Sequence, residues 1–208
     1  MHPTARVFYR RRTVITVPDC SDLIGWIYIA DSDIDYPVVK GQDNQFYLNH
    51  GPDGAENPWG TIFLDRQCKS DFSGRQNILY GHNFEYGMFA DLRFFREKSK
   101  FDAHRFSWLI TSDQIYRIDF FALVIVSAYD RLYIMPTENA VWQEAIEKYS
   151  RFCNGEALSE EDRCIALSTC TWEFEDARLL LIGRMMELTE QEALGNDNQN
   201  VLLHDPTF

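Results

Sequence analysis

Short hydrophobic runs recur along this chain between polar segments, and the longest of them alternates apolar with polar residues. That run covers residues 114–127, and a period of two is typical of a β-strand with one buried face. The polar pair Ser112-Asp113 separates it from a second run at residues 105–111. We therefore predict that these two runs pair as a hairpin with its turn at the polar pair.

Further runs rich in aromatic and β-branched residues are also predicted to be strands. They cover residues 25–30, 34–39, 60–65, 76–80, 164–169 and 179–186. Pro37 lacks a backbone donor, so its strand is expected at a sheet edge or a bulge. Many short strands with few helices between them indicate a closed or nearly closed β-barrel.

Helical spacing of apolar residues is found in fewer places. Residues 89–98 and 136–153 are predicted to be helices, and a short helix is expected at residues 44–49. Thr137 is a candidate N-cap for the long helix, and Asn154-Gly155 is a typical helix end.

The ends of the chain differ from its middle. Residues 1–17 show no clear periodicity, and part of this stretch is expected to be mobile. From Thr189 the chain is polar and acidic, which predicts a loosely held tail. No run approaches the roughly 20 apolar residues that a spanning helix needs, and no signal peptide is evident. We therefore expect a soluble chain.

Composition and charge narrow the classes of function. Of the 208 residues, 45% are hydrophobic and 14% aromatic, which suits a globular domain rather than a disordered chain. The net charge of −12 argues against a nucleic-acid partner, because phosphate binding needs clustered basic residues. The sequence contains neither a Cys-x-x-Cys pair nor a Gly-rich phosphate loop, so we expect no metal and no cofactor.

The five cysteines are an odd number, so at least one stays unpaired in a monomer. Cys153 and Cys164 lie in apolar surroundings and are predicted to be buried. The sequence leaves open whether Cys20 or Cys68 forms a disulfide.

Three residues at predicted strand ends have the chemistry for acyl transfer. Cys170 follows the strand at 164–169, His82 follows the one at 76–80, and Arg178 precedes the last. Taken singly, each is more often structural: a packed cysteine, a surface histidine, or an arginine paired with a carboxylate. Together they provide a nucleophile, a proton-transfer group and a cation for the developing oxyanion.

Several motifs resemble the class B sortases, cysteine transpeptidases of Gram-positive cell surfaces, and occur in the order of that family. They are Gly25-Trp26-Ile27, Ile34-Asp35-Tyr36-Pro37-Val38-Val39, Asp43-Asn44 to Tyr47-Leu48, Tyr80-Gly81-His82, Met88-Phe89 to Leu92, and Leu167-Ser168-Thr169-Cys170. The similarity runs from about Leu23 to Glu187.

This resemblance implies a mainly β fold, a closed eight-stranded sortase-type β-barrel decorated by N-terminal and inter-strand helices. The catalytic domain would cover residues 22–188, between an N-terminal segment at 1–21 and a polar tail at 189–208. We expect no counterpart of the family's membrane anchor in residues 1–21. The implied location is the extracellular face of the cell membrane of a Gram-positive bacterium.

The resemblance also implies roles for individual residues. Cys170 would be the nucleophile, His82 the acid and base, and Arg178 the group that binds the oxyanion or orients the substrate. The implied substrate-binding residues are Asn44, Leu48, Tyr133, Ile134, Ser168 and Thr171.

The hypothesis that follows is a transpeptidase acting on secreted proteins with a C-terminal sorting signal. It would cleave the sorting pentapeptide after threonine, form a thioester on Cys170, and transfer the acyl group to an amine. That amine would belong to a peptidoglycan precursor or to a pilin lysine. Two alternatives stay open: a hydrolytic cysteine peptidase and a non-enzymatic peptide-binding module.

Overall fold

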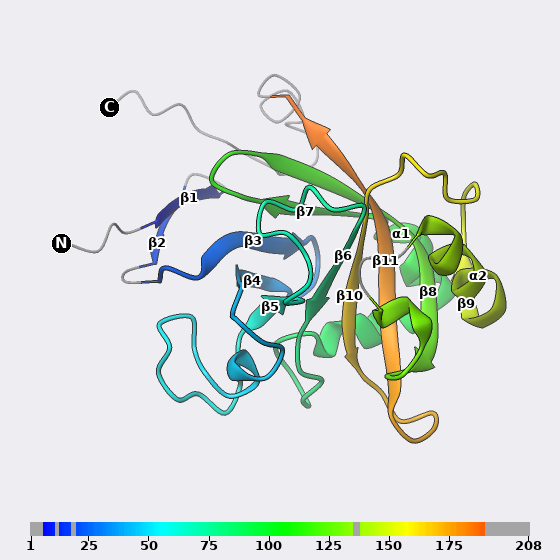
Figure 1. Ribbon diagram of the computed structural model, residues 1–208, viewed down its shortest axis with the longest axis horizontal. Coiled ribbons are helices and arrows are strands. Elements are labelled where there is room, and N and C mark those ends of the chain that lie inside the picture. Colours follow the sequence, from blue (N-terminus) through cyan, green and yellow to red (C-terminus); the bar gives the residue numbers. More distant parts are fainter. Residues whose placement is uncertain (1–5, 11–12, 18–19, 135–137, 190–208) are drawn as a thin grey trace.

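The computed structural model describes residues 6–10, 13–17, 20–134 and 138–189 (Figure 1). The strands are β1 (Arg6–Arg10), β2 (Thr13–Val17), β3 (Leu23–Ile29), β4 (Asp35–Val39), β5 (Ile62–Leu64), β6 (Gln76–Tyr80), β7 (Phe106–Ile110), β8 (Ile115–Ser127), β9 (Ser150–Cys153), β10 (Cys164–Cys170) and β11 (Ala177–Leu188). The helices are η1 (Phe46–Leu48), η2 (Ala90–Arg96), α1 (Lys98–Ala103), η3 (Arg131–Tyr133) and α2 (Asn139–Tyr149), where η marks a 3₁₀ helix.

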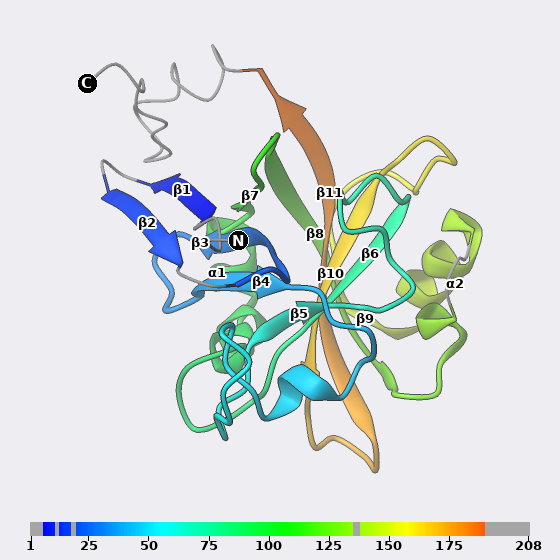
Figure 2. The same cartoon turned by 60° about the vertical axis from the view of Figure 1, so that its left-hand side comes forward.

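The main sheet closes into the predicted eight-stranded barrel. Its strands follow the order β11-β10-β6-β5-β4-β3-β7-β8, and β8 pairs again with β11. Figure 2 shows β8, β10 and β11 crossing at the middle of the molecule. The closing ladder runs antiparallel along nearly the whole of β8 and β11, with a register shift between Ile182 and Gly183. Because both strands are long and rich in buried apolar residues, this seam joins two walls of one core.

Aromatic side chains attach the helices to the barrel. Phe95 of η2 packs edge-on against Phe120 of β8, with ring centroids 5.7 Å apart. Trp142 of α2 is fully buried, and its indole nitrogen donates to the backbone oxygen of Leu132, 3.3 Å away. Within the described ranges, no helix has both the length and the apolar content needed to cross a bilayer.

The helix predicted over residues 136–153 is shorter than expected. It ends at Tyr149, and Ser150–Cys153 form β9, which pairs with β8 beside residues 122–124. Apolar residues continue at helical spacing past Tyr149. Residues 150–153 nevertheless leave the helix, because their backbone groups pair with the otherwise free edge of β8. The prediction that Cys153 is buried was also wrong, since its side chain is exposed. The candidate cap Thr137 lies outside the described residues.

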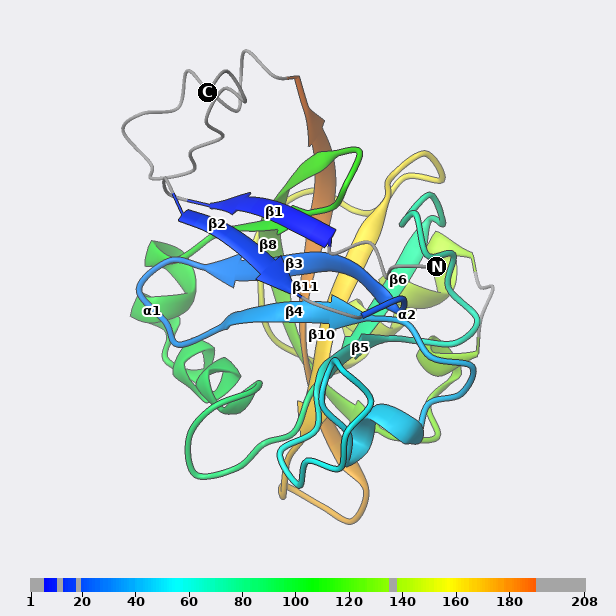
Figure 3. The same cartoon turned by 90° about the vertical axis from the view of Figure 1, so that its left-hand side faces the viewer.

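Two other segments differ from expectation. The helix predicted over residues 89–98 is the 3₁₀ helix η2, followed by the separate helix α1. Residues 6–10 and 13–17, where no periodicity was recognised, pair as the antiparallel hairpin β1–β2. Figure 3 shows this hairpin alongside β3. β-Branched and aromatic residues make up most of both strands, so their strand propensity explains the pairing.

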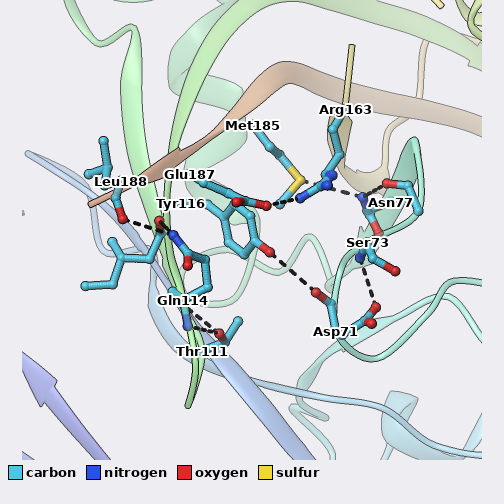
Figure 4. A network of polar contacts seen from close by, with 12 residues as sticks. Asp71, Ser73, Asn77, Thr111, Gln114, Tyr116, Arg163, Met185, Glu187 and Leu188 are labelled. Atoms are coloured by element: carbon cyan, nitrogen blue, oxygen red, sulfur yellow. Dashed lines mark hydrogen bonds and ion pairs between the residues drawn. The ribbon is translucent and has the colours of Figure 1, made fainter. Parts of the chain in front are cut away.

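A polar network fastens the C-terminal end of β11 to its neighbours (Figure 4). Arg163 forms an ion pair with Glu187, with 2.6 Å between nitrogen and oxygen. The side-chain amide of Gln114 donates to the backbone oxygen of Leu188 over 3.0 Å. These contacts hold the barrel closed at the end of β11 that is remote from Arg178.

Candidate active site

His82, Cys170 and Arg178 lie in one row across three neighbouring strands. Cys170 and Arg178 are register partners at the end of the antiparallel β10–β11 ladder. On its other side β10 runs parallel to β6, and the last register pair there is Ser168 with Tyr80. Cys170 lies two residues after Ser168, and His82 lies two residues after Tyr80. The side chains of Tyr80, His82, Ser168 and Cys170 line one groove, so they lie on the same face of the sheet.

Hydrogen bonds continue this alignment beyond the end of β6. The amide of Gly81 donates to the backbone oxygen of Ser168 at 3.2 Å, and the hydroxyl of Thr169 donates to the backbone oxygen of Gly81 at 2.7 Å. The side-chain amide of Asn83 donates to the backbone oxygen of Cys170 at 2.7 Å. The histidine segment is therefore fixed to the cysteine strand on both sides of His82.

Gly81 allows this close approach. An added Cβ would lie 2.4 Å from Cδ1 of Ile62 and 2.7 Å from the ring of Phe89. A larger residue would force the strand away from the barrel wall, and His82 would move with it.

The backbone of Leu48 determines the tautomer of neutral His82. Nε2 of the ring lies 2.7 Å from the backbone oxygen of Leu48. A carbonyl oxygen only accepts hydrogen bonds, so Nε2 carries the hydrogen and donates it. The lone pair of the neutral ring is then on Nδ1, which becomes the nitrogen that gains and loses a proton.

The carboxylate at position 173 pairs with Arg96 rather than with Arg178. Glu173 lies between Cys170 and Arg178 in the sequence and forms its ion pair with Arg96 of η2. The hydroxyl of Thr171 accepts from Arg96 and donates to Glu173 at 2.6 Å. Partial burial opposes ionisation, but the bonds from Arg96 and Thr171 prevail and lower the pKa of Glu173 to about 2. This arrangement anchors the loop between Cys170 and Arg178.

A groove of about 510 Å³ runs over the row. Besides His82, Cys170 and Arg178, it is lined by four of the residues that the resemblance assigns to substrate binding: Asn44, Leu48, Tyr133 and Ser168. Tyr133 and Ser168 join across it, with their hydroxyl oxygens 2.8 Å apart. The other two assigned residues lie outside this lining: Ile134 is largely exposed, and Thr171 is buried in its contacts with Arg96 and Glu173. The size of the groove suits a short segment of extended peptide.

One wall of the groove rests on a buried carboxylate that the sequence analysis missed. Asp65 follows β5 and accepts from the hydroxyl of Tyr80 at 2.9 Å and from the side-chain amide of Asn44 at 2.8 Å. The other end of the Asn44 amide accepts from the backbone of Arg66 at 2.8 Å. Both ends of Asn44 are thereby oriented, and burial together with Asp65 raises the pKa of Tyr80.

The arrangement has the chemistry of thiol-based acyl transfer. An exposed thiol, an imidazole with a defined tautomer and a guanidinium line the same peptide-sized groove. Among the described residues, no group of three or more His, Cys, Asp or Glu side chains could hold a metal ion.

Comparisons with known proteins were made for both sequence and structure. No protein-family model matches the chain. A curated sortase B of Listeria monocytogenes is 32% identical over 173 residues, which are 79% of this chain and 70% of that protein. A sortase B of Staphylococcus aureus is 23% identical over 175 residues, 81% of this chain and 72% of its own.

Solved structures of the same class share the fold. A class B sortase of Streptococcus pyogenes involved in pilus biogenesis superposes with a TM-score of 0.73 and 30% identity, covering 80% of this chain and 93% of its own. The Staphylococcus aureus sortase B–substrate complex has a TM-score of 0.74 at 22% identity, covering 82% of each chain.

Proposed function

The chain belongs to the class B sortases, which are cysteine transpeptidases, and from this premise we propose its substrates and the roles of its residues. The proposed donor is a secreted protein with a C-terminal sorting pentapeptide, cleaved after threonine. The acceptor is an amine of a peptidoglycan precursor or a pilin lysine, and similarity to a sortase involved in pilus biogenesis supports the second. Relatives indicate an enzyme of the cell envelope, and we propose the extracellular face of a Gram-positive membrane.

The first step assigned to this site is attack by the Cys170 thiolate on the carbonyl carbon of threonine. Negative charge then develops on the carbonyl oxygen. Arg178 stands beside Cys170 as its register partner and offers a planar set of donors to that oxygen. Asn44, Leu48, Tyr133 and Ser168 would hold the peptide in the groove, and Ile134 would be an outer contact. Thr171 would act on the substrate indirectly, by positioning the loop after Cys170 through Arg96 and Glu173.

The second role is proton transfer by His82. As imidazolium it protonates the nitrogen of the leaving peptide, the C–N bond breaks, and the acyl group remains on Cys170 as a thioester. Because Nε2 donates to Leu48, we assign the exchanged proton to Nδ1. The acceptor amine then attacks the thioester, and His82 takes the proton that the amine loses.

The observation that supports this proposal most strongly is the row formed by Cys170 on β10, Arg178 on β11 and His82 just beyond the end of β6. The residues come from distant parts of the sequence, yet they meet on one face at one end of the barrel. A packed cysteine, a surface histidine and a structural arginine would have no reason to share a groove.

Product analysis tests the proposal. The enzyme is mixed with a library of sorting-type pentapeptides, with and without triglycine or a lysine peptide, and the products are identified by mass spectrometry. Cleavage after threonine with a product ligated to the amine is expected, and Cys170→Ala should show neither. Cleavage that no amine diverts would instead support the hydrolytic peptidase. Binding without cleavage would support the peptide-binding module.

A further inference from the structure

A second surface adjoins His82 outside the groove. The ring of Phe84 packs against the imidazole, with centroids 4.7 Å apart. Trp59 contacts Phe84 with centroids at 4.9 Å and Tyr86 with centroids at 5.4 Å. We call Trp59, Phe84 and Tyr86 the aromatic cluster. Trp59 is 40% exposed and Tyr86 64% exposed, so this cluster presents aromatic rings to solvent beside a proposed catalytic histidine.

Two tight turns of the backbone hold the aromatic cluster in place. Asn83 and Met88 form a β-bridge around the turn that carries Phe84 and Tyr86, and Gly87 adopts a φ of +78° within it. The loop that carries Trp59 is closed by Gly60, where a Cβ would lie 2.5 Å from the backbone oxygen of Tyr47. The rings are thus presented by fixed turns, which lowers the entropy cost of binding a ligand.

The two loops that carry the aromatic cluster contain carboxylates and no lysine or arginine of their own, although the side chain of Arg93 reaches one of them. Residues 49–61 and 82–92 contain no lysine or arginine, whereas their carboxylates are Asp53, Glu56, Glu85 and Asp91. The nearby Arg93 donates to the backbone oxygens of Ala90 at 2.9 Å and Glu85 at 2.6 Å. Exposed aromatic faces attract organic cations through the ring quadrupole, and the carboxylate of Glu85, which lies between Phe84 and Tyr86 in the sequence, acts in the same sense.

We infer that the aromatic cluster is the entry site for the acceptor, which it binds through the primary ammonium group of a peptide and delivers past His82 to Cys170. This inference rests on the proposed transpeptidase function. The groove holds the donor peptide, so the acceptor needs a separate approach to the same carbonyl. Phe84 packs against the imidazole that must deprotonate the acceptor. An amine bound at the aromatic cluster would therefore approach the carbonyl from the side of His82.

The transfer step balances as follows. The bound ammonium first loses one proton to solvent, and the neutral nitrogen attacks the thioester carbonyl. A C–N bond forms, the C–S bond breaks, and its electron pair returns to the sulfur of Cys170. The second proton lost by nitrogen passes to Nδ1 of His82, which regenerates the thiolate and imidazolium.

Amine-dependent partitioning of the thioester tests this inference. The amount of ligated product is measured at increasing amine concentrations for the wild type, Tyr86→Ala and Glu85→Gln. Each value is divided by the amount of leaving fragment released in the same reaction. Each variant should need about threefold to tenfold more amine for half-maximal transfer. Tyr129→Ala is the matched control, since Tyr129 is an 82% exposed tyrosine outside the cluster. Equal amine dependence in Tyr86→Ala and Tyr129→Ala would overturn the inference. Parallel series with triglycine and with a lysine peptide identify the preferred source of the amine.

A binding experiment separates failure of the inference from failure of the proposed function. The indole N–H signal of Trp59 is assigned by comparison with Trp59→Phe. It is then followed by NMR during titration with Nα-acetyl-lysine amide, which keeps the side-chain ammonium. The neutral isostere acetyl-norleucine amide serves as the control ligand. A saturable shift with the lysine ligand alone is expected even in Cys170→Ala. No shift would overturn the inference, whereas a shift in a protein that never forms a thioester would overturn only the transpeptidase function.

Discussion

Cys170 and Arg178 face each other as the last register pair of the β10–β11 ladder, at one end of a barrel that a polar network closes at the other. Backbone pairing, rather than a flexible loop, determines the separation of thiol and guanidinium. The loop between them, residues 171–177, is anchored in turn by Arg96 through Thr171 and Glu173. This relationship makes the oxyanion role of Arg178 testable by a change that keeps its charge.

Arg178→Lys should lower kcat/KM for peptide cleavage by about 10²–10³-fold, because an ammonium replaces the planar fork of donors. Steady-state kinetics with a cleavable sorting peptide measures this loss. The folded structure should survive, since the side chain bonds only to its neighbouring backbone oxygen among the contacts described. Activity within threefold of the wild type would contradict the assigned role.

Glu173→Gln should make the free energy of unfolding depend less on pH in the acid range. The pKa of Glu173 is lowered from 4.5 to about 2 in the folded protein, so its ion pair stabilises the fold above about pH 4.5. That contribution is lost as pH falls towards 2. Urea unfolding should therefore show the wild type about 1 kcal/mol more stable than the variant near pH 7, with the difference disappearing near pH 2. Glu175→Gln, at an exposed position of the same loop, is the control.

Gly81→Ala should destabilise the fold by about 1–3 kcal/mol, because the new methyl group overlaps Ile62 and Phe89. It should also reduce activity by displacing His82. Urea unfolding and peptide cleavage measure the two effects. Gly74→Ala is the matched control, since its nearest contact would be an ordinary 3.4 Å. Equal stability of the two variants would show that the barrel wall adjusts without cost.

Asp65→Asn should weaken substrate binding more than it slows the chemistry. Tyr80 and Asn44 both donate to Oδ2 of Asp65, and the backbone of Gln67 donates to Oδ1. The new amide must turn its NH₂ group towards one of these sets of donors, which weakens the network that orients Asn44. We expect KM for the peptide to rise several-fold, with a smaller change in kcat. Asp113→Asn, at an exposed turn, controls for loss of charge. A fall in kcat with KM unchanged would argue against this positioning role.

Much of the barrel was predictable because its strands carry local signals. The alternation at residues 114–127 and the apolar run before Cys170 correspond to β8 and β10. The boundary between α2 and β9 was not predictable, because the open edge of β8 determines it and that edge is a tertiary feature. In the hairpin β1–β2, strand propensity was present, but no alternation accompanied it.

The residues of the site also divide into those with a local sequence signal and those without one. The motifs around His82 and Cys170 are local, so a resemblance could point to them. The contacts of Asp65 require three separate segments to converge, and nothing in the sequence near Asp65 signals that Asn44 and Tyr80 will meet there. The aromatic cluster likewise draws Trp59 and Tyr86 from different loops.

Intact-mass analysis of the protein after brief mixing with a cleavable sorting peptide tests the central claim most directly. Cys153 provides an internal control, because its thiol is also exposed but lies away from the groove. The account predicts an adduct with the mass of the peptide up to threonine in the wild type and in Cys153→Ala, and none in Cys170→Ala. An adduct that persists in Cys170→Ala, or that disappears in Cys153→Ala, would contradict it.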